Sequence, residues 1–275
     1  MDFVTSPTGG TRIAYRVTAA TTPTVTAAPP ALLVHGTALS QAIWRGFGYL
    51  RELAADRPVV TVDLRGHGRS DKPRGIHDYA MQHFVDDVIA LLDHLGLDRV
   101  HYAGYSLGGR LGFSLAAEHP QRLASFASIA GAPGTGSGVF DRVFFPDSIA
   151  ALERGGVELF LEEWAAASGH DIDPATRGAF LANDAAALAA YMRAAEQAER
   201  VEDAAIAALP MPVLLVAGTR DRPRLTAAEH VRALLPEARL LLVEGADHGS
   251  TPRRPEVAPA LREFFAAVDA AAASA

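Results

Sequence analysis

Residues 100–112 read Val-His-Tyr-Ala-Gly-Tyr-Ser-Leu-Gly-Gly-Arg-Leu-Gly, and this stretch decides the fold. The apolar run at 100–103 is typical of a buried strand, and a helical pattern begins at Leu107. Gly104 separates the two patterns, so we expect Ser106 on a sharp turn between strand and helix. The Gly-x-Ser-x-Gly spacing is that of a nucleophile elbow, in which flanking glycines let the two elements pack closely. A glycine-rich turn with an ordinary surface serine has the same spacing.

Strand and helix patterns alternate on both sides of this stretch. Residues 3–17 predict an edge hairpin, and residues 18–30, rich in threonine, alanine and proline, predict a solvated connection. Short apolar runs predict further strands at 31–34, 59–62, 123–129, 213–217 and 239–243. Helical patterns occupy 41–54, 79–95, 107–118, 227–235 and 257–268. Together they predict an α/β fold with a mostly parallel, doubly wound sheet of about eight strands.

The rhythm changes between about residues 131 and 205, where helical segments follow one another without a convincing strand. This part starts with the glycine-rich stretch 134–138. A chain of 275 residues suits one α/β domain with an insertion better than two domains. We therefore expect a core at 1–133 and 206–275 and an inserted helical lid at 134–205.

Composition narrows the classes of function. The chain has 25 basic and 32 acidic residues, a net charge of −7, and no run of lysine or arginine, so nucleic acid is not an expected partner. The absence of cysteine excludes disulfides, thiolate metal sites and a cysteine nucleophile. The first residues lack the pattern of a secretory signal, and no run approaches the roughly 18 apolar residues that span a bilayer. We expect a cytoplasmic protein without membrane contact.

A serine needs a neutral imidazole and a carboxylate nearby to become a nucleophile. In a parallel sheet, these partners are expected in loops that follow later strands. Asp221 follows the strand at 213–217, and His248 follows the strand at 239–243. The resulting order predicts Ser106 as nucleophile, Asp221 as acid and His248 as base. Asp247 is an alternative acid, although its position directly before His248 makes the ring contact awkward.

These motifs together resemble the α/β-hydrolase family over nearly all of the chain. His35-Gly36-Thr37 is similar to the oxyanion loop of that family, and the resemblance implies an oxyanion hole formed by the amides of Thr37 and Leu107. The stretch Asp63-Leu-Arg-Gly-His-Gly-Arg-Ser70 is similar to the loop after the family's next strand. His35 and His67 are expected to brace their loops.

No metal ion and no other cofactor are expected. The histidines are scattered, and no His-Glu-x-x-His pattern occurs. Nothing in the sequence indicates the oligomeric state.

The nucleophile and the lid bear on the substrate. Branches that resemble haloalkane dehalogenases and epoxide hydrolases carry aspartate at the elbow, so Ser106 argues against both. The lid is rich in large apolar side chains, and a tryptophan follows the oxyanion loop; the predicted substrate contacts are Trp44, Phe140, Phe144 and Trp164. We expect a small, largely apolar ester or lactone that is cleaved through an acyl-enzyme.

The same triad also serves other chemistry. Carbon–carbon bond hydrolases, amidases, perhydrolases and biosynthetic acyl transferases or cyclases remain alternatives for an enzyme of this type. A small-molecule receptor that retains the triad without rapid turnover is the alternative from a different class. The intact set of motifs favours an enzyme acting on a small molecule.

Overall fold

The computed structural model describes residues 1–22 and 28–274. The strands are β1 (Asp2–Thr5), β2 (Arg12–Thr18), β3 (Ala31–Val34), β4 (Val59–Val62), β5 (Val100–Tyr105), β6 (Leu123–Ile129), β7 (Val213–Gly218) and β8 (Arg239–Val243). The α-helices are α1 (Ala42–Gly46), α2 (Tyr49–Leu53), α3 (Met81–His94), α4 (Leu107–Glu118), α5 (Val139–Val143), α6 (Ser148–Ser168), α7 (Pro174–Leu181), α8 (Ala185–Gln197), α9 (Asp203–Ala207), α10 (Arg222–Leu234) and α11 (Val257–Ala273). Short 3-10 helices lie at Ile76–Tyr79, Pro120–Arg122 and Thr251–Arg253.

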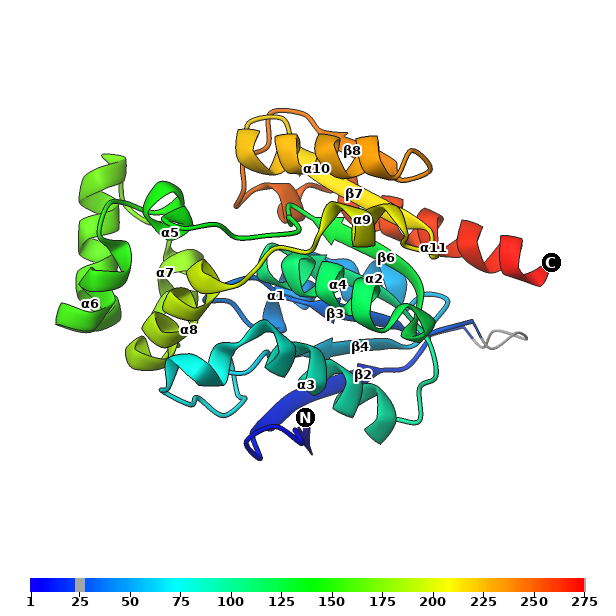
Figure 1. The fold of residues 1–275 in the computed structure, drawn as a ribbon, viewed down its shortest axis with the longest axis horizontal. Coiled ribbons are helices and arrows are strands. Elements are labelled where there is room, and N and C mark those ends of the chain that lie inside the picture. Colours follow the sequence, from blue (N-terminus) through cyan, green and yellow to red (C-terminus); the bar gives the residue numbers. More distant parts are fainter. Residues whose placement is uncertain (23–27, 275) are drawn as a thin grey trace.

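The described strands form one eight-stranded sheet in the order β1-β2-β4-β3-β5-β6-β7-β8 (Figure 1). β1 and β2 form the antiparallel hairpin at one edge, and every pairing from β4 to β8 is parallel. The predicted α/β class with a mostly parallel sheet is confirmed. Part of the connection expected at 18–30, namely residues 23–27, lies outside the described residues.

Helices cover both faces of the sheet, because successive side chains of a strand point to opposite faces. In β3, Leu32 and Val34 belong to a core that also contains side chains of α3, α4 and α10. Ala31 and Leu33 belong to a second core, built with side chains of α1, α2 and α11. All four β3 residues are fully buried, which is why this strand is apolar along its whole length.

Several helices differ from the sequence prediction, and two of them differ for a local structural reason. The helix expected at 41–54 is divided into α1 and α2, since Gly48 has a left-handed backbone with φ of 85°. The helix expected from residue 227 begins earlier, at Arg222, with Asp221 in the N-cap position and Pro223 in the first turn. Proline there lacks only an N–H that the first turn of a helix does not use.

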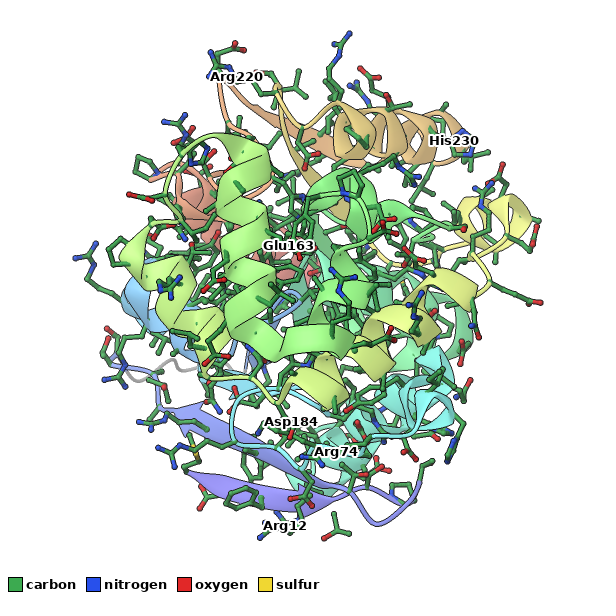
Figure 2. The ribbon with its side chains drawn as sticks, turned by 90° about the vertical axis from the view of Figure 1, so that its left-hand side faces the viewer. Arg12, Arg74, Glu163, Asp184, Arg220 and His230 are labelled. Carbon is green, nitrogen blue, oxygen red and sulfur yellow. The ribbon has the colours of Figure 1, made fainter. Side chains whose placement is uncertain are left out.

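The segment between β6 and β7 consists of α5 to α9, and Figure 1 shows α5 to α8 gathered at one end of the molecule. β6 and β7 are neighbours, with Ile129 paired to Val216, so this segment leaves and rejoins the sheet between adjacent strands. An exposed ion pair of 2.7 Å joins Arg74, beyond β4, to Asp184 at the start of α8 (Figure 2). None of the described helices is both long and apolar enough to cross a membrane.

Candidate active site

The turn that carries Ser106 is tight and strained. Ser106 has φ of 52° and ψ of −106°, a backbone conformation that serine rarely adopts and that costs about 1–3 kcal/mol. A Cβ atom at Gly104 would overlap the carbonyl oxygen of Gly108, and one at Gly108 would overlap the carbonyl oxygen of Val34. Both glycines are therefore needed for the close packing of α4 against β5 and β3, and this packing holds the serine on its turn.

Three side chains from separate loops meet at this turn. The Oγ atom of Ser106 lies 3.0 Å from Nε2 of His248, and Nδ1 of His248 lies 2.7 Å from Oδ2 of Asp221. Asp221 follows β7 and is 8% exposed, whereas His248 follows β8 and is 27% exposed. A carboxylate only accepts hydrogen bonds, so Nδ1 carries the proton and Nε2 is left to accept the proton of the serine hydroxyl.

The alternative acid, Asp247, has other partners. Its Oδ1 atom accepts a hydrogen bond of 2.6 Å from the Ser250 hydroxyl and one of 2.8 Å from the Ser250 amide. The Ser250 hydroxyl is the main reason why the pKa of Asp247 lies below its usual value. Asp247 therefore stabilises the turn after β8, and the structure places only Asp221 at hydrogen-bond distance from the His248 ring among these two aspartates.

The loop after β3 approaches Ser106 closely. A Cβ atom at Gly36 would lie 2.9 Å from the ring of Tyr105 and 3.2 Å from Cβ of Ser106, so glycine lets the loop pass there. Thr37 follows, and its Oγ1 atom lies 3.0 Å from the hydroxyl of Tyr191 in α8. Leu107 is the first residue of α4, where the backbone N–H has no partner within the helix. Thr37 and Leu107 both line the same cavity as Ser106.

His35 and His67 are buried behind this loop. Nε2 of His35 accepts a hydrogen bond of 3.0 Å from the amide of Leu64, and Nδ1 of His67 donates one of 2.9 Å to the carbonyl of Arg65. Burial lowers the pKa of both rings, that of His67 to about 3. Both are neutral at pH 7. His35 joins the loop after β3 to the loop after β4, and His67 braces its own loop, as the sequence predicted.

A cavity of about 550 Å³ opens over Ser106 and His248. Phe140, Phe144 and Trp164 line it, at the positions predicted from the sequence. Further lining side chains were not singled out as contacts from the sequence: Phe47, Phe180, Tyr191 and Arg224. Aromatic walls and a few polar groups are typical of a small-molecule site.

Trp44 is a correction to the sequence prediction. Its side chain is fully buried and packs edge-on against Tyr49, with 4.8 Å between ring centroids. It belongs to the core beneath the other face of the sheet and does not line the cavity. The prediction rested on the closeness of Trp44 to the loop after β3 in the sequence. That closeness does not show that the Trp44 side of α1 faces the core.

Within the described residues, no group of three or more histidine, aspartate or glutamate side chains is arranged to hold a metal ion. The cavity walls offer carboxylates at Asp173 and Asp247, but both accept hydrogen bonds from nearby donors in their own loops.

Comparisons with known proteins agree with the fold and its motifs. The family model for the alpha/beta hydrolase fold matches residues 29–167, just over half of the chain. The protein RutD of Pseudomonas savastanoi pv. phaseolicola is 30% identical over 243 residues, which cover 81% of this chain and 88% of RutD.

Solved structures are similar over almost the whole chain. A thermophilic esterase from Thermogutta terrifontis has a TM-score of 0.79 at 26% identity, with 97% of this chain and 98% of the esterase covered. An enol-lactonase from Burkholderia xenovorans LB400 has a TM-score of 0.79 at 21% identity, with 96% and 100% covered. Together with the family match, these findings show that the chain is an enzyme of the alpha/beta hydrolase family.

Proposed function

We propose that the protein is a serine hydrolase that cleaves a carboxylic ester or lactone of a small, largely apolar substrate. The observation that carries this proposal is the hydrogen-bonded chain from Ser106 through His248 to Asp221. A serine, an imidazole and a carboxylate in this geometry are the components of acyl transfer. The similar solved structures of an esterase and an enol-lactonase support the choice of an ester or lactone.

In the proposed reaction, Oγ of Ser106 attacks the substrate carbonyl carbon while its proton passes to Nε2 of His248. Asp221 stabilises the imidazolium, and the amides of Thr37 and Leu107 donate hydrogen bonds to the oxyanion. Collapse of the tetrahedral intermediate breaks the ester bond, and His248 returns the proton to the leaving alcohol. Water then attacks the acyl-enzyme with His248 as base. One oxyanion donor contributes about 2.7–4 kcal/mol in such enzymes.

We propose that aromatic side chains of the segment between β6 and β7 form the pocket for the acyl or alcohol group. Phe140 and Phe144 stack with 6.4 Å between ring centroids, and Trp164 packs edge-on against Phe144 at 5.0 Å. All three line the cavity above the serine. This arrangement supports a lid at residues 134–205 and a preference for apolar groups next to the reacting carbonyl.

The first test is intact-mass analysis after treatment with a fluorophosphonate, together with hydrolysis of short and long nitrophenyl esters and simple lactones. We expect one label per chain and turnover of some panel members, and we expect both to vanish in Ser106→Ala. Ser168→Ala is the matched control, since this serine is exposed at the end of α6. A label that persists in Ser106→Ala would contradict the assignment. Labelling without turnover would favour the receptor or biosynthetic alternative.

A further inference from the structure

Arg224 lies in the wall of the catalytic cavity without a partner. It stands in the first turn of α10, three residues after Asp221, and lines the same cavity as Ser106 and His248. Its guanidinium makes no hydrogen bond and no ion pair with any residue of 1–22 or 28–274, and the side chain is half-buried. A guanidinium has five N–H donors, and those of Arg224 are free to bind a group in the cavity.

The other arginines in the described ranges differ from Arg224. Each is either solvent-exposed or donates at least one hydrogen bond, as in the buried pair of Arg65 with Asp87 at 2.6 Å. Exposed arginines need no protein partner, because water satisfies their donors. Among the arginines of the described residues, Arg224 is thus the half-buried one that donates no hydrogen bond to the protein, so its donors are available to a ligand in the cavity.

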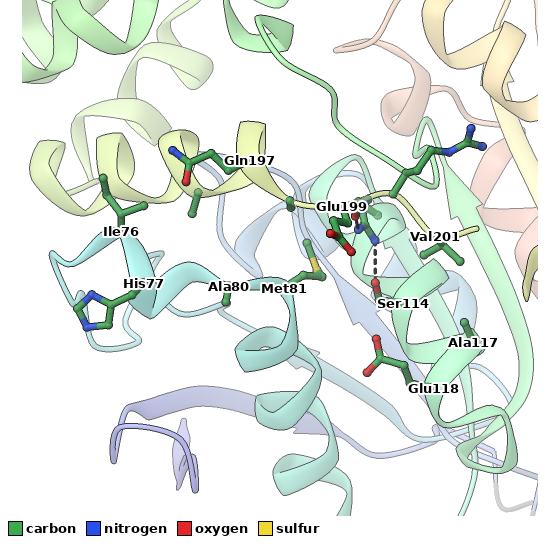
Figure 3. Close-up of a pocket in the computed structure, with 14 residues that line it drawn as sticks. Ile76, His77, Ala80, Met81, Ser114, Ala117, Glu118, Gln197, Glu199 and Val201 are labelled. Atoms are coloured by element: carbon green, nitrogen blue, oxygen red, sulfur yellow. Dashed lines mark hydrogen bonds between the residues drawn. The ribbon is translucent and has the colours of Figure 1, made fainter. Parts of the chain in front are cut away.

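Arg110 also lines the cavity, but its guanidinium already donates hydrogen bonds to other residues of the protein. Its guanidinium donates 2.7 Å to the hydroxyl of Ser114, the dashed line in Figure 3, and 2.6 Å to the carbonyl of Glu199. Arg110 therefore ties α4 to the chain after α8. It lines both the catalytic cavity and a second cavity of about 520 Å³, whose lining residues Figure 3 shows. Arg224 has no such bracing role.

The charged groups near Arg224 are compatible with an anion bound beside it. The carboxylate of Asp221 is close enough to Arg224 to oppose the fall in the pKa of Arg224. The Oδ2 atom of Asp221, however, accepts a hydrogen bond from His248. Burial is the main reason why the pKa of Arg224 is lowered, and the positive charge of Arg142, on α5, acts in the same direction. A half-buried guanidinium in the wall of a cavity is stabilised when an anion binds beside it.

We propose that the substrate of this site carries a carboxylate that binds to Arg224, so that the ester or lactone is one of a dicarboxylic or hydroxycarboxylic acid. This inference rests on the proposed hydrolase function. A guanidinium presents two parallel N–H donors that match the two oxygens of a carboxylate. The aromatic walls contact the hydrocarbon part between that carboxylate and the reacting carbonyl at Ser106.

The test compares esters that differ only in a terminal group. Monoethyl adipate and ethyl hexanoate share chain length and leaving group, but the first ends in a carboxylate and the second in a methyl group. 4-Acetoxybutanoate and butyl acetate form the corresponding pair with the charge on the alcohol side. Acid release in a pH-stat gives kcat/KM for each ester with the native protein, Arg224→Gln, Arg224→Lys and Arg222→Gln. Arg222 is exposed on the same helix and is the matched control for loss of one positive charge.

In one of the two pairs, we expect the anionic ester to have the higher kcat/KM, chiefly through a lower KM. Arg224→Gln is expected to reduce the anionic-to-neutral ratio roughly 10- to 100-fold, the size of a lost charge-assisted hydrogen bond. Arg224→Lys is expected to restore part of the ratio, and Arg222→Gln to retain it. An unchanged ratio in Arg224→Gln for both pairs would overturn the proposal, whereas hydrolysis of the neutral esters would still support the hydrolase function.

A binding measurement separates the two proposals further. Calorimetric titration of Ser106→Ala with the same esters requires no turnover. We expect the anionic member of one pair to bind at least about tenfold more tightly, and this preference to vanish in Ser106→Ala/Arg224→Gln. Equal affinities for the anionic and neutral members of both pairs would overturn the carboxylate site even if the native protein hydrolyses esters. Selective binding without any turnover would instead overturn the hydrolase proposal alone.

Discussion

The hydroxyl of Tyr105 donates a hydrogen bond of 3.0 Å to the backbone carbonyl of His248. Tyr105 is the last residue of β5 and directly precedes Ser106, so one side chain links the strand before the proposed nucleophile to the loop of the proposed base. The Tyr105 ring also lies beside the His248 ring, with 5.5 Å between centroids. This tyrosine therefore joins the loop of Ser106 to the loop of His248.

We expect Tyr105→Phe to lower kcat about five- to tenfold while KM changes little, since one neutral hydrogen bond is worth about 0.5–1.5 kcal/mol. Ester hydrolysis under saturating substrate measures the effect. Tyr79→Phe is the matched control, because it removes another buried hydroxyl, which donates 2.6 Å to the carbonyl of Pro73. Equal losses of kcat in both variants would mean that Tyr105 does not position His248.

The two candidate acids can be separated by paired amide substitutions. Asp221→Asn removes the acceptor that keeps the proton on Nδ1 of His248, and we expect turnover to fall by about 10⁴-fold. Asp247→Asn disturbs only the turn with Ser250, so its loss should be at least about 100-fold smaller. Steady-state kinetics on one ester gives both numbers. A larger loss in Asp247→Asn would reverse the assignment of the acid.

The elbow packing predicts the effect of one added methyl group. Gly104→Ala places a Cβ atom into the carbonyl of Gly108, and we expect the free energy of unfolding to fall by about 1–3 kcal/mol or more. Gly178→Ala is the control within α7: nothing lies within 4 Å of the added Cβ atom, so helix propensity should raise stability by about 0.5–1 kcal/mol. Urea unfolding followed by circular dichroism measures both changes. Equal destabilisation would refute the close approach of α4 to β5.

The free energy of unfolding should decrease as the pH drops below about 6.5. Burial lowers the pKa of His67 to about 3 in the folded protein, against about 6.5 in the unfolded chain. Only the unfolded state therefore takes up this proton as the pH drops through 6.5. The neutral, buried His67 ring thus contributes its full stabilisation well above pH 6.5, and this stabilisation is lost as the pH falls towards 3. For His67 the loss by pH 5 is about 2 kcal/mol.

Unfolding in urea at pH 7 and pH 5 tests this dependence. His67→Gln cannot titrate, so its difference in stability between the two pH values should be smaller than that of the native protein. His77→Gln, which changes a largely exposed ring, should keep the native difference. Identical pH dependence in the native protein and His67→Gln would show that His67 is protonated equally in both states.

The strands could be read from the sequence because a parallel sheet covered on both faces buries every residue of its central strands. The predicted bounds 31–34, 59–62 and 123–129 coincide with β3, β4 and β6. The loop positions of Asp221 and His248 followed from the same strands, and the structure brings both side chains to Ser106. Their catalytic roles remain predictions.

Other features depend on packing that a single sequence does not express. A helical pattern continued through Gly48, because a glycine permits a left-handed backbone but does not require one. The residues around Trp44 in the sequence do not show whether its side chain lines the cavity or packs in the core beneath the sheet. Arg224 lay before the expected start of its helix, and its unpaired state is visible only once the surrounding loops are in place.

The insertion point of the helical segment has a consequence for engineering. The chain departs after Ile129 and returns at Val213, on strands that are hydrogen-bonded neighbours, and Ser106, Asp221 and His248 all lie outside this stretch. The segment can therefore be treated as an exchangeable cassette whose two ends join adjacent strands of the sheet, at the carboxyl end of β6 and the amino end of β7. A graft from a relative would replace Phe140, Phe144 and Trp164 together while retaining the proposed reacting groups. Such chimaeras should therefore take their acyl preference from the grafted segment and their bond-breaking chemistry from this chain.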